Sequence, residues 1–419
     1  MQKYLRDEKT LNNCKIYQML LQNNQKKHLS FHTPGHKIGE WDITELSFSD
    51  NLSSPRGCIA EAQEDIAKIL GAVKSFILTD GSTSGVLSML YTAKSLGVKT
   101  IAFSIHSHKS VFNGCKLLGL TPLLYEENAG TMYEMNAFFE GADALFFTSP
   151  DYYGRMAELK KIREYCDKTG KLFLVDGAHG GHLHFDKNHY AGAYADLWVD
   201  GVHKSLPAFT QGAVVSARTD LLGEKLQEAV DIFRTTSPSY PIMASVEYAV
   251  KYPRNEELEK CVLEFQQHPR IIKNDDWTKL CASFGTYAFA VEKELEREGI
   301  YAEFCDGDVV MFYLSPATSL KEFETIKTRL MELFKKYPYS PSKQLQRVHA
   351  PIVLDKNLEM EWVDIENAAG RICAINCGLF PPCTPLLTVG EVISEEKART
   401  LRQADNVFGL QKNKILVLQ

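Results

Sequence analysis

A lysine and a histidine stand side by side after one of the apolar runs of this chain. His203 and Lys204 follow residues 197–199, a run that is typical of a buried strand. In a site of low dielectric constant the amine of such a lysine loses its charge and becomes nucleophilic. Most lysines lie on protein surfaces, so a chemical role for Lys204 needs support from other motifs.

A glycine- and hydroxyl-rich loop and an acidic residue offer that support. The loop Thr79–Gly85 lies between a predicted strand and a predicted helix, and it contains Ser82 and Thr83. Glycines allow close backbone approach and a helix N-terminus attracts anions, so this loop could hold a phosphate, or it could be an ordinary helix cap. Asp176 follows another apolar run, where it could keep a ring nitrogen protonated or cap the next helix.

The histidines have alternative interpretations. His108 comes after the apolar run at 100–103 and could stack on a flat aromatic ligand, or it could lie in a solvated loop. A second group contains a pair spaced two residues apart, as zinc sites do, and consists of His179, His182, His184 and His189. Because no set of cysteines or carboxylates completes this group, we expect no metal.

The spacing of the apolar residues predicts the elements that position these motifs. We expect strands at 75–78, 100–103, 144–147, 172–175, 197–199 and 213–216, and helices at 59–71, 86–96 and 157–168. Continuous apolar runs separated by helices indicate an α/β fold with a mainly parallel sheet covered on both faces. Ligands bind such sheets at the carboxyl ends of the strands, where the four motifs would converge.

Length and composition favour two domains. The chain has 419 residues, 44% of them hydrophobic, which is more than one core usually contains. From about residue 250 the pattern changes to a charged segment at 255–276, then a helix at 287–298, a strand at 309–314 and a helix at 320–336. We therefore expect a large domain over residues 1–280 and a smaller α/β domain over residues 281–419.

Charge and cysteine usage narrow the classes of function. The net charge is −6, and the sequence contains neither a basic stripe nor a long apolar segment, so nucleic-acid and membrane partners are not expected. Ten cysteines without a secretion signal are typical of reduced thiols. We expect a cytoplasmic protein that acts on a small molecule.

Taken in order, the motifs resemble those of the bacterial-type ornithine/lysine/arginine decarboxylases. Further similar segments extend the match over nearly the whole chain: Phe31–Lys37 (FHTPGHK), Asp42–Glu45, Asp50–Gln63, Ser237–Tyr240, Phe380–Pro382, Pro385–Leu387 and Gly390–Glu391. The resemblance implies the aspartate-aminotransferase fold (fold type I) and pyridoxal 5'-phosphate as cofactor. It is closest to the short form of the family, without the N-terminal receiver-like domain.

The resemblance also implies which residues surround the cofactor ring. Lys204 would hold the cofactor as a Schiff base, with His203 beside it. Asp176 would pair with the pyridine nitrogen. Ala178 would lie beneath the ring and His108 would stack on its other face.

The resemblance further implies how the phosphate is bound. Ser82 and Thr83 would bind it, and Thr236 of the partner subunit would reach it across an interface. The family places its active sites between subunits, so a homodimer or a higher homo-oligomer is implied.

This chain departs from the family's pattern at several positions. Gly201 stands where the family usually has a serine, two residues before the histidine, which removes one hydroxyl that would face the phosphate. The other departures are at Val86, Pro207, Gly212, Ile375, Cys383 and Thr384. They bear on the substrate and on the rate, while Lys204 and Asp176 are retained.

We therefore expect decarboxylation of lysine, arginine or ornithine to the corresponding amine of polyamine metabolism. The proton donor is left open between Lys204 and His203. One alternative is another reaction on the same fold, as in an aminotransferase or an aldolase. Another is a divergent member that binds the cofactor in a structural or regulatory role, which the departures at Gly201 and Ile375 motivate.

Overall fold

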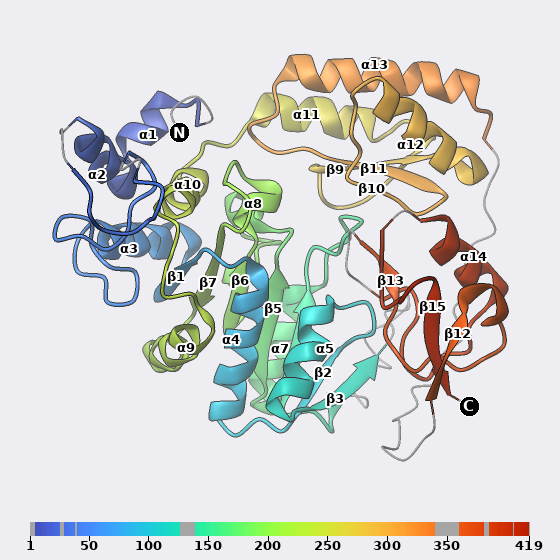
Figure 1. The fold of residues 1–419 in the computed structure, drawn as a ribbon, viewed down its shortest axis with the longest axis horizontal. Coiled ribbons are helices and arrows are strands. Elements are labelled where there is room, and N and C mark those ends of the chain that lie inside the picture. Colours follow the sequence, from blue (N-terminus) through green and yellow to red (C-terminus); the bar gives the residue numbers. More distant parts are fainter. Residues whose placement is uncertain are drawn as a thin grey trace.

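A seven-stranded sheet lies at the centre of the protein (Figure 1). The computed structural model describes residues 5–25, 29–37, 40–125, 139–339, 360–380, 385–404 and 406–418. The strands are β1 (Lys74–Leu78), β2 (Thr100–Ser104), β3 (Thr121–Tyr125), β4 (Ala144–Thr148), β5 (Leu172–Gly177), β6 (Leu197–Asp200) and β7 (Ala213–Ala217), in the order β1-β7-β6-β5-β4-β2-β3. Strands β2 to β6 are parallel, whereas β7 is antiparallel to β6 and β1. The expected mainly parallel α/β sheet is confirmed, with each of the six predicted strands in place.

Helices cover both faces of this sheet. One face packs against α4 (Ser82–Ser95), α5 (Lys109–Leu118) and α9 (Asp220–Phe233). The other face packs against α3 (Cys58–Leu70), α7 (Leu159–Thr169), α10 (Tyr240–Val250) and the N-terminal α2 (Lys15–Asn24), which follows the short α1 (Glu8–Asn12). Burial of both faces explains why the strands are continuously apolar. The predicted helices at 59–71, 86–96 and 157–168 correspond to α3, α4 and α7.

A second, antiparallel sheet carries its own helices, drawn at the top of Figure 1. Its strands are β8 (Ile271–Ile272), β9 (Lys279–Ser283), β10 (Phe304–Cys305) and β11 (Val309–Tyr313), in the order β10-β11-β9-β8. The helices are α11 (Glu256–Phe265), α12 (Ala288–Arg297) and α13 (Leu320–Lys336). The predicted elements at 287–298, 309–314 and 320–336 are confirmed as α12, β11 and α13. Residues of α11 share a hydrophobic cluster with this sheet, and the domain boundary near residue 280 stays a prediction.

The C-terminal residues form a third group of elements, coloured red in Figure 1. Strands β12 (Met360–Asp364) and β15 (Lys414–Leu418) pair with each other, as do β13 (Gly378–Leu379) and β14 (Val407–Phe408). Together with α14 (Glu395–Gln403) they bury a cluster that includes Phe304 and Met311 of the second sheet. This packing ties the C-terminal residues to the second sheet. Among the residues described above, no helix combines the length and the apolar character needed to cross a bilayer.

Candidate active site

The loops that follow β1, β4, β5 and β6 meet at one edge of the central sheet. Strands β4, β5 and β6 are parallel, and β1 points the same way as β6 because each pairs antiparallel with β7. Leu78 at the end of β1 pairs with Ala213, and Asp200 at the end of β6 pairs with Val214. The loops after β1 and β6 are therefore neighbours across the start of β7, as the sequence predicts for a ligand site.

Lys204 lies on the short helix α8 (Val202–Ser205), directly after β6. Its Nζ is 3.1 Å from Nε2 of His179, a residue of the loop after β5. Lys204 is half-buried, and His179 is 7% exposed. The amine therefore lies in a partly buried environment next to a titratable ring.

Asp176 lies near the carboxyl end of β5 and is 3% exposed. Its Oδ1 accepts a hydrogen bond of 3.0 Å from the backbone N–H of Ala178. Burial raises the pKa of Asp176, against the lowering effects of the Ala178 N–H and of the charge on Lys204. The carboxyl and the amine are thus close enough to influence each other.

His108 and His203 both lie close enough to Lys204 for its charge to lower the pKa of each ring. His108 caps α5, and its Nδ1 accepts the backbone N–H of Ser110 at 3.2 Å. Burial, with repulsion from Lys204 and then Lys109, lowers the pKa of His108 to about 3. Burial also lowers the pKa of His203, in the presence of Lys204, although a bond of 2.9 Å from Nδ1 to the Gly212 carbonyl oxygen opposes the shift. Both rings are therefore neutral at pH 7.

The loop before α4 presents a buried hydroxyl that lacks a partner. Gly81, with φ of +77°, precedes Ser82, whose Oγ makes no hydrogen bond to any described residue although it is inaccessible to solvent. A Cβ on Gly201 would lie 2.4 Å from the Ala178 carbonyl oxygen and 2.8 Å from Ser82 Oγ. The departure from serine at position 201 therefore follows from close contact between the two loops, since this backbone leaves no room for a side chain.

Two of the predicted phosphate ligands are exposed in the single chain. Thr83 follows Ser82 in the first turn of α4 and faces solvent, as does Thr236. The backbone N–H of Thr235 donates to Asp80 Oδ2 at 3.2 Å. The segment that carries Thr236 therefore adjoins the loop at 79–85, and its role across a subunit interface stays a prediction.

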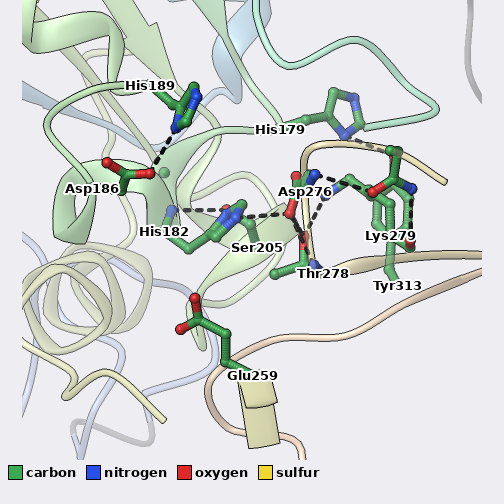
Figure 2. Close-up of polar contacts among 12 residues, drawn as sticks. His179, His182, Asp186, His189, Ser205, Glu259, Asp276, Thr278, Lys279 and Tyr313 are labelled. Atoms are coloured by element: carbon green, nitrogen blue, oxygen red, sulfur yellow. Dashed lines mark hydrogen bonds and ion pairs between the residues drawn. The ribbon is translucent and has the colours of Figure 1, made fainter. Parts of the chain in front are cut away.

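A polar network beside Lys204 was not foreseen from the sequence (Figure 2). Tyr313, at the end of β11, places its hydroxyl 2.9 Å from Nδ1 of His179. The ammonium of Lys279 lies 4.2 Å from the centroid of the Tyr313 ring. Lys279 is paired with Asp276 at 3.3 Å, and Asp276 with Nε2 of His182 at 2.9 Å. The sequence signal for this network is a lysine at the first position of an otherwise apolar strand, three residues after an aspartate.

The four histidines considered for a metal site have separate partners. His179 contacts Lys204, and His182 contacts Asp276. The other two rings bind elsewhere: His184 to the Gly181 carbonyl oxygen, and His189 to Asp186. Among the described residues no group of three or more His, Cys, Asp or Glu side chains is arranged to hold a metal ion.

Most of the remaining departures lie in hydrophobic packing, beside His203 or outside the described residues. Val86 is buried in the core beneath α4, and Ile375 packs against the C-terminal cluster. A Cβ on Gly212 would lie 2.8 Å from a methyl group of Val246, so the close packing of α10 accounts for this glycine. Cys383 and Thr384 lie outside the described residues, and Pro207 has no structural explanation.

Comparisons with solved structures identify the fold. The chain superposes on the constitutive lysine decarboxylase of Escherichia coli with a TM-score of 0.72 and 18% identity, over 98% of this chain and 82% of that one. A serine palmitoyltransferase from Sphingomonas wittichii gives a TM-score of 0.58 at 14% identity, over 78% of this chain and 85% of that one. The expected fold type I architecture, with a large sheet domain and a smaller α/β part, is confirmed.

Sequence comparisons identify the family. The model described as "Orn/Lys/Arg decarboxylase, major domain" matches residues 40–138 and 134–274. The chain belongs to the Orn/Lys/Arg decarboxylase family, a class of amino-acid decarboxylases. It is 28% identical to the uncharacterized protein YaaO of Bacillus subtilis, over 93% of this chain and 94% of that protein. It is 26% identical to the arginine decarboxylase of Bacillus anthracis, over 93% and 92% of the two chains.

Proposed function

We propose that this chain decarboxylates a basic amino acid (lysine, arginine or ornithine) with pyridoxal 5'-phosphate bound at Lys204. One observation carries the proposal: Lys204 directly follows β6, and the buried carboxyl of Asp176 lies near the carboxyl end of the adjacent parallel strand β5, where the charge on Lys204 acts on it. The relatives named arginine and lysine decarboxylase support a basic substrate. The product would be the corresponding amine, as in polyamine metabolism.

The residues around Lys204 fit this cofactor. The unpartnered Ser82 Oγ at the N-terminus of α4 supplies a donor for a phosphate, and the Gly81 backbone leaves space beside it. Asp176 would pair with the ring nitrogen, with Ala178 and His108 on the two ring faces. Thr83 of the same chain would also bind the phosphate, and Thr236 of the partner subunit would complete the site. The proposal therefore includes a homodimer.

The protein's own groups prepare the reaction by controlling charge and water. Pyridoxal phosphate, when bound, withdraws the electrons of a bond at the substrate's α-carbon. Asp176, whose carboxyl accepts the Ala178 N–H, would keep a ring nitrogen protonated. His108 and His203 are half-buried and neutral, so they would add no positive charge that stabilises a substrate carboxylate, and their rings would displace water from the site.

The test is reconstitution of the purified protein with pyridoxal phosphate, followed by titration with lysine, arginine and ornithine. We expect a visible absorption band, and CO₂ and the matching amine from at least one substrate. Lys204→Met should abolish the band and lower activity by more than about 10³-fold, as removal of covalent catalytic groups does. Lys225→Met is the matched control, because this partly exposed lysine lies on α9 and pairs with Glu228. A wild-type protein that stays colourless, or that releases CO₂ from none of the three, would contradict the proposal.

A further inference from the structure

A short chain of hydrogen bonds ends on the amine of Lys204. Nε2 of His179 is 3.1 Å from Lys204 Nζ, and Nδ1 of the same ring is 2.9 Å from the Tyr313 hydroxyl. That hydroxyl is also 3.3 Å from the backbone carbonyl oxygen of Tyr152. The rings of Tyr152 and Tyr313 meet His179 edge-to-face, with centroid distances of 5.0 and 5.6 Å, and they fix its plane.

The number of hydrogens in this chain allows two arrangements. A phenol carries one hydrogen, and a carbonyl oxygen can only accept. If Tyr313 donates to the Tyr152 carbonyl, then His179 must donate from Nδ1 to Tyr313, and its Nε2 accepts from Lys204. If Tyr313 donates to Nδ1 instead, the hydrogen of a neutral His179 lies on Nε2 and is donated to Lys204. The orientation of one hydroxyl therefore sets the direction of the hydrogen bond at the amine.

The electrostatic environment keeps the imidazole of His179 and the phenol of Tyr313 in their neutral forms. Burial raises the pKa of Tyr313 well above its usual value, so the phenol retains its hydrogen. Burial and nearby positive charge lower the pKa of His179 well below its usual value. The titratable groups near His179 include two lysines, two histidines and two tyrosines: Lys204, Lys279, His108, His203, Tyr152 and Tyr313. The protonated form of His179 is consequently disfavoured, which favours return of the proton to Lys204.

On the basis of the proposed role of Lys204, we propose that His179 accepts protons from the Lys204 amine and returns them, and that Tyr313 selects the tautomer of His179. In the forward step an N–H bond of the Lys204 ammonium breaks and an N–H bond forms at His179 Nε2. The positive charge moves from the ammonium to the imidazolium. Nδ1–H is then donated to Tyr313, whose own hydrogen is turned to the Tyr152 carbonyl. In the reverse step the proton returns to the Lys204 amine.

Lys279 is a positioning residue for this chain of hydrogen bonds. Its ammonium lies against the face of Tyr313, and it is held by Asp276 and by Thr278 Oγ1 at 2.8 Å. A cation on the ring face stabilises the ring in that plane, which directs the hydroxyl towards His179 (Figure 2). The same charge contributes to the lowered pKa of His179.

The first test measures how fast the cofactor-free protein forms an imine with added pyridoxal phosphate, followed by absorbance. We expect His179→Gln to slow imine formation by about 10²-fold at neutral pH, the lower end of the contribution of general acid–base groups. His189→Gln, which removes an exposed imidazole bonded only to Asp186 among the contacts described, should react at the wild-type rate. Equal rates for His179→Gln and the wild type would overturn the inference.

The second test reads the tautomer of His179 directly from its imidazole ¹⁵N shifts in the cofactor-free protein. In the wild type we expect shifts between those of the two tautomers. Tyr313→Phe leaves Nδ1 buried without its hydroxyl partner, and an orphaned donor costs more than an orphaned lone pair. The shifts should therefore move to the Nε2–H form. Tyr153→Phe, whose hydroxyl bonds Asp306 instead, is the control.

The outcomes separate this inference from the proposed function. A wild-type protein that forms an absorbing adduct at Lys204, together with fast imine formation in His179→Gln, would overturn the inference and leave the proposed function standing. The absence of any adduct in the wild type would overturn both. If His179→Gln does not fold, identical tautomer shifts in the wild type and Tyr313→Phe would still overturn the role of Tyr313.

Discussion

Two clusters of buried charge in this protein are alike in composition and differ in what they touch. The Asp276 cluster consists of His182, Asp276 and Lys279, and the Asp276 and Lys279 side chains are both fully buried. The Glu391 cluster pairs Glu391 with Lys397, whose side chains are 5% and 3% exposed. In each cluster one carboxylate neutralises a lysine that would otherwise be costly to bury.

The two clusters differ in which residues their carboxylates contact. Glu391 bonds to the backbone N–H of Thr388 at 3.1 Å and to Lys397, so its partners are near in the sequence and stabilise a local turn into α14. Asp276 instead bonds His182, 94 residues away, and through Lys279 and Tyr313 it reaches the ring that contacts Lys204. Buried charge alone therefore does not identify a chemical site, whereas contact with a reactive amine does.

The largest expected change in stability comes from removing the carboxylate of either cluster. Asp276→Ala and Glu391→Ala should each lower the free energy of unfolding by ~3–5 kcal/mol, because each leaves a buried cation without its partner. Asp276→Ala should also lower decarboxylase activity per folded molecule by about tenfold, equal to ~1.4 kcal/mol, while Glu391→Ala should not. Urea unfolding and activity at matched folded concentration are the measurements.

A conservative control accompanies this pair of variants. Asp276→Asn keeps the hydrogen bonds to Thr278 while removing the charge, and it serves if Asp276→Ala does not fold. The comparison fails if Glu391→Ala loses as much activity per folded molecule as the Asp276 variants.

A third buried carboxyl sharpens the comparison because, within the part of the chain that the structure describes, it bonds a phenol and pairs with no cation. Asp200 accepts from Tyr190 at 2.7 Å, and burial raises its pKa from 3.8 to about 7. Between these pH values the unfolded chain has released the proton that the folded protein retains. The free energy of unfolding therefore falls as the pH rises from 4 to 7.

Asp200→Asn removes this titration. The free energy of unfolding of the wild type should fall between about pH 5 and about pH 8, whereas that of the variant should not, because its amide remains neutral. The difference between variant and wild type should therefore change by on the order of 2–4 kcal/mol in favour of the variant. Urea unfolding of both proteins at the two pH values measures the difference. A variant with the pH dependence of the wild type would show that Asp200 is ionised in the folded protein.

The smallest expected effect is at an exposed ion pair. Glu324 and Lys327 are 2.9 Å apart on α13, with side chains 52% and 36% exposed. Glu324→Gln should change the free energy of unfolding by less than about 0.5 kcal/mol, because water screens the pair. A larger change would mean that burial does not explain why the two clusters contribute more to the free energy of unfolding than surface ion pairs do.

The strands of the central sheet could be predicted because the same physical cause, burial on both faces, produced each apolar run. Strand β3 was missed because it lies at the edge of the sheet, where exposed Thr121 and Pro122 interrupt the apolar pattern. Helices α5, α9, α10 and α11 were not assigned. The run at 255–276 was recognised as charged, but its apolar residues Leu258, Val262 and Phe265 form the buried side of α11.

The candidate site could be predicted in part. Lys204, Asp176 and Ser82 each follow a strand, and a parallel sheet brings such positions to one edge. Tyr313 could not be found this way, because it is 134 residues from His179 and belongs to another sheet. Lys279 was overlooked because a lysine is ordinarily exposed. The role of Thr236 depends on a subunit interface, which one chain does not contain, and the role of Thr83 in binding the phosphate stays a prediction.

The hydrogen bond between His179 and Tyr313 also joins two separately built layers. His179 follows a strand of the seven-stranded sheet, and Tyr313 ends a strand of the four-stranded one. Such a bond weakens steeply once its atoms separate beyond about 3.5 Å, so a small displacement of one sheet relative to the other would free His179 to change its tautomer.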